Sequence, residues 1–146
     1  MNTILHERRL EAYYCTLCYA SIDQKRRIMT IANSGLPYPV RCTAEGCGLL
    51  ELAGFPLGTF EGSAYEELNL ELHEGDVWLF YTDGVVDAND RQGREFGSEQ
   101  LIRLVEQLRD QSARTVVDTI FETVQNFRGT TRIHDDMTLV ALKITN

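Results

Sequence analysis

Two acidic sites in this chain carry the residue types most suited to chemistry. Asp83 follows an apolar run over residues 77–82 and precedes Gly84, while Asp135 and Asp136 directly precede a second apolar run over residues 137–142. A carboxylate at the end of a buried strand is costly to desolvate unless it is paired or binds a metal, and adjacent carboxylates repel each other unless a cation relieves them. Carboxylates from distant strands could hold Mg²⁺ or Mn²⁺ with several waters, one of them activated for attack on phosphorus.

Each site also has an ordinary structural interpretation. Asp-Gly is among the commonest turn dipeptides, so Asp83 and Gly84 taken alone favour a simple turn. Asp135 and Asp136 could equally be solvated acids at the start of a strand. The metal interpretation gains weight because two strand-linked acidic sites occur in one chain, as a hard-cation site requires.

The elements that would position these acids follow from hydrophobic periodicity. We expect a helix over residues 1–12, then strands over 13–22, 27–32, 38–43, 49–52, 65–72 and 76–83, two helices capped by Ser98 and Ser112, and a last strand over 137–144. The polar residues 23–26 predict a hairpin turn. Segregated strands and helices predict an α+β fold with largely antiparallel sheet, and the consecutive amphipathic helices predict an antiparallel pair on one sheet face.

Composition excludes several classes of protein. At 146 residues the chain has the length of a single domain, and its net charge of −8 argues against binding to nucleic acid or to an anionic membrane surface. No apolar run reaches the roughly 18 residues of a membrane span, and the Met1 end is too polar for a signal peptide. A cytoplasmic location is the default expectation.

Four cysteines, Cys15, Cys18, Cys42 and Cys47, raise the possibility of a zinc site. Cys15 and Cys18 fall in a predicted strand, where residues three apart face opposite sides, and the tight turn of a zinc knuckle is missing. We therefore expect free thiols, buried or half-buried, in a reducing compartment. A zinc-stabilised interaction domain is kept as an alternative.

Six short motifs follow one another in an order that resembles a known family. They are Ala32–Pro37, Phe55–Gly58, Leu72–Asp76, Phe80–Val85, Phe96-Gly97 and Asp135–Leu139. Together they resemble the C-terminal part of the PPM-type, metal-dependent serine/threonine phosphatases, in the bacterial SpoIIE-like branch. The resemblance extends over nearly the whole chain, and its Thr-Asp-Gly and Asp-Asp-x-Thr elements are specific as an ordered set.

The resemblance implies a fold, a cofactor and a reaction. The family has a β-sandwich of mainly antiparallel sheets with antiparallel helix pairs and a dinuclear Mn²⁺ or Mg²⁺ centre. By position, Asp83 and Asp135 would be metal ligands, Asp136 an outer neighbour and Gly84 the close-approach residue. The implied reaction is hydrolysis of phosphoserine or phosphothreonine by metal-activated water. The implied substrate is a phosphorylated regulatory protein such as a STAS-domain antagonist in sigma-factor control.

The sequence also departs from the family pattern. The family's earlier Gly-Asp-x-x-Asp and Asp-x-x-Gly-His-Gly elements are not in this sequence, Leu36 stands where many relatives have histidine, and Asp87 stands where they often have glutamate. Residues 1–146 are therefore expected to form a single, partial domain, incomplete on its N-terminal side, with about half of the ligands. Exposed sheet edges then predict a homo-oligomer. The alternative is a catalytically inactive, phosphatase-like regulatory or binding module.

Overall fold

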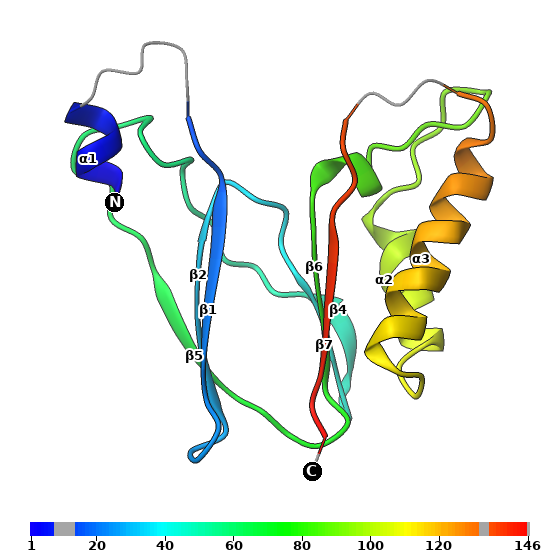
Figure 1. Cartoon of the computed structure of the whole chain (residues 1–146), viewed down its shortest axis with the longest axis horizontal. Helices are drawn as coiled ribbons and strands as arrows, with labels where there is room; N and C mark the ends of the chain where they lie inside the picture. Colours follow the sequence, from blue (N-terminus) through cyan, green and yellow to red (C-terminus); the bar gives the residue numbers. More distant parts are fainter. Residues whose placement is uncertain (8–13, 132–134, 146) are drawn as a thin grey trace. The chain divides into compact units, whose positions relative to one another are not determined.

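The computed structural model describes residues 1–7, 14–131 and 135–145 (Figure 1). Contacts divide the chain into two compact units. Unit 1 comprises Met1–Tyr38 with Glu51–Leu72, and unit 2 comprises Pro39–Leu50 with His73–Asn146. Each unit is built on its own antiparallel sheet, which confirms the predicted α+β class with antiparallel strands.

Unit 1 contains a short helix and a three-stranded sheet in the order β1-β2-β5. Its elements are α1 (Asn2–Glu7), β1 (Leu17–Asp23), β2 (Ile28–Ser34) and β5 (Glu67–Glu71). The predicted hairpin is confirmed: Asp23 Oδ1 accepts hydrogen bonds from the amides of Lys25 and Arg26, both at 3.0 Å, and so closes the turn. Met29 and Ile31 of β2 are fully buried and form the centre of this unit.

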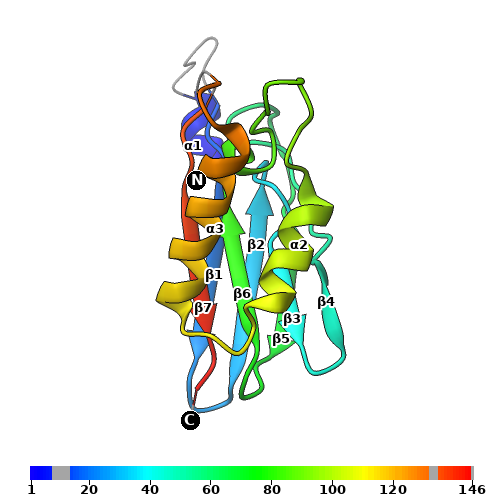
Figure 2. The ribbon, with the colours of Figure 1, turned by 90° about the vertical axis from the view of Figure 1, so that its right-hand side faces the viewer.

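Unit 2 carries a four-stranded sheet covered on one face by two helices (Figure 2). The sheet order is β4-β3-β6-β7, from β3 (Val40–Thr43), β4 (Gly46–Leu49), β6 (Val77–Tyr81) and β7 (Leu139–Lys143), and the helices are α2 (Ser98–Gln107) and α3 (Ala113–Arg128). Alternate residues of β6, Val77, Leu79 and Tyr81, pack with the apolar faces of both helices in one core. The predicted helix pair on one sheet face is confirmed.

Strand β6 is the most deeply buried element of the chain. Val77, Trp78 and Leu79 have no exposed surface. Because side chains alternate along a strand, Trp78 lies on the face opposite the helices, where the Arg41 guanidinium stands 5.1 Å from its ring centre. The strand preceding Asp83 is thus buried on both faces, as its unbroken apolar sequence predicts.

Several predicted boundaries were wrong. The fourth strand is Gly46–Leu49, not 49–52, because pairing with β3 overrides the low strand propensity of its two glycines. Strand β1 begins only at Leu17, and residues 8–12 of the predicted first helix lie outside the described residues. Ser98 does not cap α2: Gly97 is the N-cap, with a φ of 76° that favours glycine.

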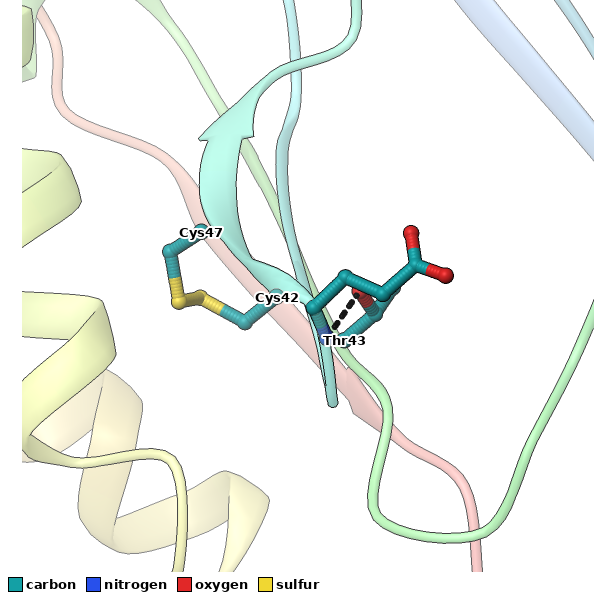
Figure 3. Close-up of a disulfide and its surroundings, with 4 residues drawn as sticks. Cys42, Thr43 and Cys47 are labelled. Carbon is teal, nitrogen blue, oxygen red and sulfur yellow. Dashed lines mark hydrogen bonds between the residues drawn. A yellow bond between two sulfur atoms is a disulfide. The ribbon is translucent and has the colours of Figure 1, made fainter.

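The expectation of four free thiols was also wrong. Cys42 and Cys47 are directly opposite in the β3–β4 hairpin, with Cα atoms 4.0 Å apart, and form a disulfide (Figure 3). Cys15 and Cys18 remain free, and burial raises the pKa of the Cys18 thiol. The disulfide removes two of the four candidate zinc ligands, so the zinc alternative is not supported.

No helix within the described ranges is long and apolar enough to cross a bilayer.

The two serines at the helix starts provide a matched stability test. Ser112 accepts a hydrogen bond from the Thr115 amide at 3.1 Å, whereas Ser98 is the first helical residue and makes no cap bond. Ser112→Ala should lower the free energy of unfolding by about 1 kcal/mol, measured by urea denaturation. Ser98→Ala is the control, and an equal loss in both variants would contradict the assignment of the caps.

Candidate metal centre

Thr82 fastens the end of β6 to the start of β7. Its hydroxyl donates to the carbonyl of Asp136 at 2.9 Å and accepts from the amide of Thr138 at 2.9 Å. Its own amide donates to the carbonyl of Thr138 at 3.2 Å. These bonds continue the β6–β7 ladder, whose last pair is Tyr81 with Leu139. Thr82, which directly precedes Asp83, is therefore hydrogen-bonded to both Asp136 and Thr138.

Gly84 completes this junction by steric fit. A Cβ atom at this position would lie 2.6 Å from the carbonyl oxygen of Asp136 and 3.0 Å from that of Asp135. No residue with a side chain fits there without moving one of the two backbones. The close approach expected of Gly84 is thus made to the Asp135-Asp136 backbone.

The three aspartates of this junction present their side chains to solvent. Asp83, Asp135 and Asp136 are all exposed. Asp83 opens a 3₁₀ turn, η1 (Asp83–Val85), and its Oδ1 accepts from the Gly84 amide at 2.9 Å. The expected cost of desolvating Asp83 is therefore not incurred, because the chain leaves the buried strand one residue earlier, at Thr82. Exposed carboxylates suit an ion that keeps part of its water shell.

Two further acids share the electrostatic field of this junction. The pKa of Asp87 is raised, first by partial desolvation and then by the negative charges of Asp83, Glu95 and Asp135. In the sequence, Asp87 stands out only as a difference from the family pattern. Glu95 was not predicted as part of the site. Its one sequence signal is its position directly before the Phe96-Gly97 motif. Asp83, Glu95 and Asp135 are therefore near enough to Asp87 for their negative charges to disfavour its ionised form.

The loop that carries Asp87 and Glu95 is held by Asp90. This carboxylate is buried, and it accepts from the amides of Gln92 at 2.8 Å and Arg94 at 3.0 Å. The Arg94 side chain donates to its other oxygen through Nε and Nη2, both at 2.7 Å. Backbone bonding by Arg94 is the largest of the effects that lower the pKa of Asp90. Asp90 thus fixes the loop between η1 and α2.

The junction offers the type of ligand atom that a divalent cation prefers, but few ligands of that type. Carboxylate oxygens are the ligands that Mg²⁺ prefers and Mn²⁺ accepts. Across residues 1–7, 14–131 and 135–145, no group of three or more His, Cys, Asp or Glu side chains is close enough to hold a metal. In proteins, Mg²⁺ usually keeps several waters and is held by one or two carboxylates together with substrate phosphates. A dinuclear centre needs more ligands than the described residues bring together.

Comparison with known proteins decides the family. The family model described as stage II sporulation protein E (SpoIIE) matches residues 1–145. The chain belongs to the SpoIIE family. This match confirms the resemblance inferred from the six ordered motifs.

The curated relatives of this SpoIIE-family chain are bacterial phosphatases. It is 23% identical over 145 residues to the phosphoserine phosphatase RsbU of Bacillus subtilis (strain 168), covering 98% of this chain and 43% of RsbU. It is 34% identical over 76 residues to the phosphoserine phosphatase RsbP of the same organism, covering 51% of this chain and 19% of RsbP. The chain therefore spans less than half of the length of either relative.

Solved structures confirm the PPM fold. The PP2C phosphatase domain of SpoIIE from Bacillus subtilis, solved with a fragment of its regulatory domain, has a TM-score of 0.81 at 21% identity, covering 98% of this chain and 42% of that one. The SiaA-PP2C domain of Pseudomonas aeruginosa has a TM-score of 0.78 at 21% identity, covering 88% and 51%. The catalytic domain of the phosphatase PstP, in complex with two manganese ions, has a TM-score of 0.73 at 13% identity, covering 99% and 67%. Of these proteins with the same fold, PstP was thus solved with manganese bound.

The steric fit at Gly84 gives a testable prediction. Gly84→Ala places a methyl group against two carbonyl oxygens and should lower the free energy of unfolding by roughly 1–3 kcal/mol. Gly48→Ala is the control, because a Cβ at Gly48 meets nothing within 4 Å. Urea denaturation compares the two variants, and equal stability would show that the junction is looser than described.

The Asp90–Arg94 contact predicts a dependence on pH. A carboxyl group whose pKa is lowered in the folded state stabilises the protein above its unfolded pKa, 3.8, and that stability is lost as the pH falls through the folded value. Asp90→Asn should therefore lower the melting temperature at pH 7, with a difference that shrinks as the pH falls below 3.8. Thermal unfolding across this range measures the effect, and a difference independent of pH would contradict it.

Proposed function

We propose that this chain supplies part of a SpoIIE-type protein phosphatase site, in which Asp83 and Asp135 hold Mn²⁺ or Mg²⁺. The substrate would be phosphoserine or phosphothreonine on a regulatory protein. The observation that carries the proposal is the junction at Thr82 and Gly84, which holds Asp83 beside the Asp135-Asp136 backbone. Two acids distant in the sequence are thereby positioned by a rigid strand pair.

The aspartates of the junction would have different roles in such a site. Asp83 and Asp135 would hold the ion through their exposed oxygens, and the bond from the Gly84 amide orients the Asp83 carboxylate. The Thr82 hydroxyl fixes the Asp136 carbonyl, and by position in the family the Asp136 side chain would be an outer neighbour of the ion. When bound, the metal would supply Lewis acidity and lower the pKa of a coordinated water.

Electrostatics gives a physical reason for metal dependence. Asp87 feels the charges of Asp83, Glu95 and Asp135, so this surface repels anions, and the whole chain carries a net charge of −8. A phosphate group would approach this surface against the field unless a cation reversed its sign. The same carboxylates that would repel the substrate therefore favour the ion that would bind it.

The relatives support a protein substrate. RsbU and RsbP are named phosphoserine phosphatases, and in a Mycobacterium tuberculosis protein an RsbU domain accompanies an RsbW domain (TM-score 0.73, 24% identity, covering 97% of this chain and 39% of that one). A phosphorylated STAS-domain antagonist is the substrate class we propose, in sigma-factor or related signalling control. A cytoplasmic location stays a prediction.

A second candidate function is a regulatory or binding module without turnover. It is favoured by the finding that no three metal-binding side chains come together in the described part of the chain. A site with so few ligands could recognise a phosphoprotein through a weakly held ion without hydrolysing it. Metal affinity and turnover therefore have to be measured separately.

The proposal predicts that manganese binding depends on Asp83. Isothermal titration with Mn²⁺ should show binding that weakens roughly ten-fold or more in Asp83→Asn and Asp135→Asn. Asp110→Asn is the matched control, because this acid is also exposed and lies in the loop after α2. Hydrolysis of para-nitrophenyl phosphate with Mn²⁺ should be lost in the same two variants and kept in the control.

Each other outcome has a definite meaning. Manganese binding that depends on Asp83, without turnover, would favour the regulatory module. Binding unchanged in Asp83→Asn, or no binding at millimolar Mn²⁺, would overturn the proposed ligands.

A further inference from the structure

The Cys42–Cys47 disulfide lies on the helix-covered face of the unit 2 sheet (Figure 3). The two residues face each other across the β3–β4 hairpin, so their side chains leave the sheet on the same side. Cys42 belongs to the core that the sheet shares with α2 and α3, and Cys47 packs against that core. The cross-link therefore lies where the hairpin meets the helices.

Strand β4 has few side chains that could hold it in place. Two of its four residues are glycines, Gly46 and Gly48, which have low strand propensity and no side chain to pack. Its other two residues, Cys47 and Leu49, are half-buried and pack against the core. The main contacts of β4 are with β3 and α2. The position of β4 thus depends strongly on the bond between Cys47 and Cys42.

The same cross-link adds little to the stability of the whole fold. The two cysteines are five positions apart in the sequence. A disulfide stabilises mainly by restricting the unfolded chain, and the restriction is small for so short a loop. Most of the core of unit 2 comes from β6, α2 and α3, which the disulfide does not join. Reduction is thus expected to act on β4 while the rest of the unit stays folded.

The two sulfur atoms differ in how a solvent thiol can reach them. Cys42 is buried, with 1% of its surface exposed, whereas Cys47 is half-buried. Between them, the turn has a bond of its own, because the Glu45 amide donates to Thr43 Oγ1 at 3.2 Å (Figure 3). This bond involves neither cysteine, so the turn keeps the two thiols near each other after reduction.

We infer that the Cys42–Cys47 disulfide is a reversible redox switch, which fixes β4 against α2 when oxidised and frees β4 when reduced. The reductant is a low-molecular-weight thiol. Its thiolate attacks the Cys47 sulfur and forms a mixed disulfide, while the bond between the two protein sulfurs breaks and Cys42 leaves as a thiolate that takes up a proton.

A second molecule of the small thiol completes the reduction. It attacks the small-thiol sulfur of the mixed disulfide, releases Cys47 as a thiolate that is then protonated, and leaves as half of a small-molecule disulfide. The protein gains two electrons and two protons, and two small thiols are oxidised to one disulfide. The same steps in reverse restore the Cys42–Cys47 bond.

The proposed function gives a reason for a reversible bond. In compartments that thiols keep reduced, disulfides are usually transient and redox-sensing. A phosphatase in sigma-factor or related signalling control, with the cytoplasmic location predicted from the sequence, would work in such a compartment. This step rests on the proposed function, whereas the experiments on the switch use neither metal nor substrate.

The first experiment measures reduction of the folded protein. A Cys15→Ser, Cys18→Ser variant leaves only the two bonded cysteines. Millimolar reduced glutathione should open the disulfide, so that iodoacetamide modifies both cysteines, and oxidised glutathione should restore the bond. Mass spectrometry counts the modified cysteines. A bond that resists glutathione in the folded protein and opens only in urea would overturn the proposal.

Hydrogen exchange measures whether reduction frees β4. The Leu50 amide donates to the Pro39 carbonyl at 2.9 Å and reports on the hairpin beyond the disulfide. It should exchange roughly ten-fold or more faster in the reduced protein. The Leu72 amide, which donates to the Arg27 carbonyl at 2.8 Å in unit 1, is the matched control and should not change.

Cys47→Ala shows whether the response belongs to this bond. Without the disulfide, the Leu50 amide should exchange fast with or without glutathione, while the Cys15→Ser, Cys18→Ser variant should keep the full response. Equal exchange at Leu50 in the oxidised and reduced protein would show that β4 stays in place and would overturn the proposal. Loss of protection at Leu72 as well would show general unfolding and would also overturn it.

Discussion

The junction between the end of β6 and the start of β7 is the constraint on which the acidic site depends. One hydroxyl, that of Thr82, bonds to backbone groups on both sides of Met137, and Gly84 admits the Asp135-Asp136 backbone at a distance that no larger residue would allow. Strand β6 is fully buried over Val77–Leu79. The exposed acids therefore take their positions from the core strand and its ladder, which are more rigid than the loops that carry them.

Near the same junction, negative charges of several side chains act on one another. Asp83, Glu95 and Asp135 raise the pKa of Asp87, in addition to its partial desolvation. Repulsion of this kind opposes folding. Functional sites typically contain interactions that are locally unfavourable for stability. Asp90 and Arg94 offset it by tying the intervening loop with short, charge-assisted bonds. A bound cation would offset it further, which links the stability of unit 2 to its proposed chemistry.

Some family motifs act in the fold rather than in the chemistry. In the Ala32–Pro37 motif, the buried side chain of Asn33 donates to the carbonyls of Leu36 and Leu52 and joins two loops of unit 1. In the Leu72–Asp76 motif, the Asp76 carboxylate accepts from the His73 amide and shapes the turn into β6. Both units thus keep the structural signature of the family, although the chain covers only 43% of RsbU.

Local sequence determined the elements and the candidate acids. Turn chemistry and periodicity predicted the hairpin closed by Asp23, the Ser112 cap, the buried strand before Asp83 and the apolar strand after Asp136, because each depends on neighbours within a few residues. Only the tertiary structure decided the Cys42–Cys47 disulfide, the position of β4, the exposure of Asp83 and the approach of Glu95 to Asp87. These features depend on strand register and on contacts between residues that are far apart in the sequence. Local periodicity cannot predict such contacts.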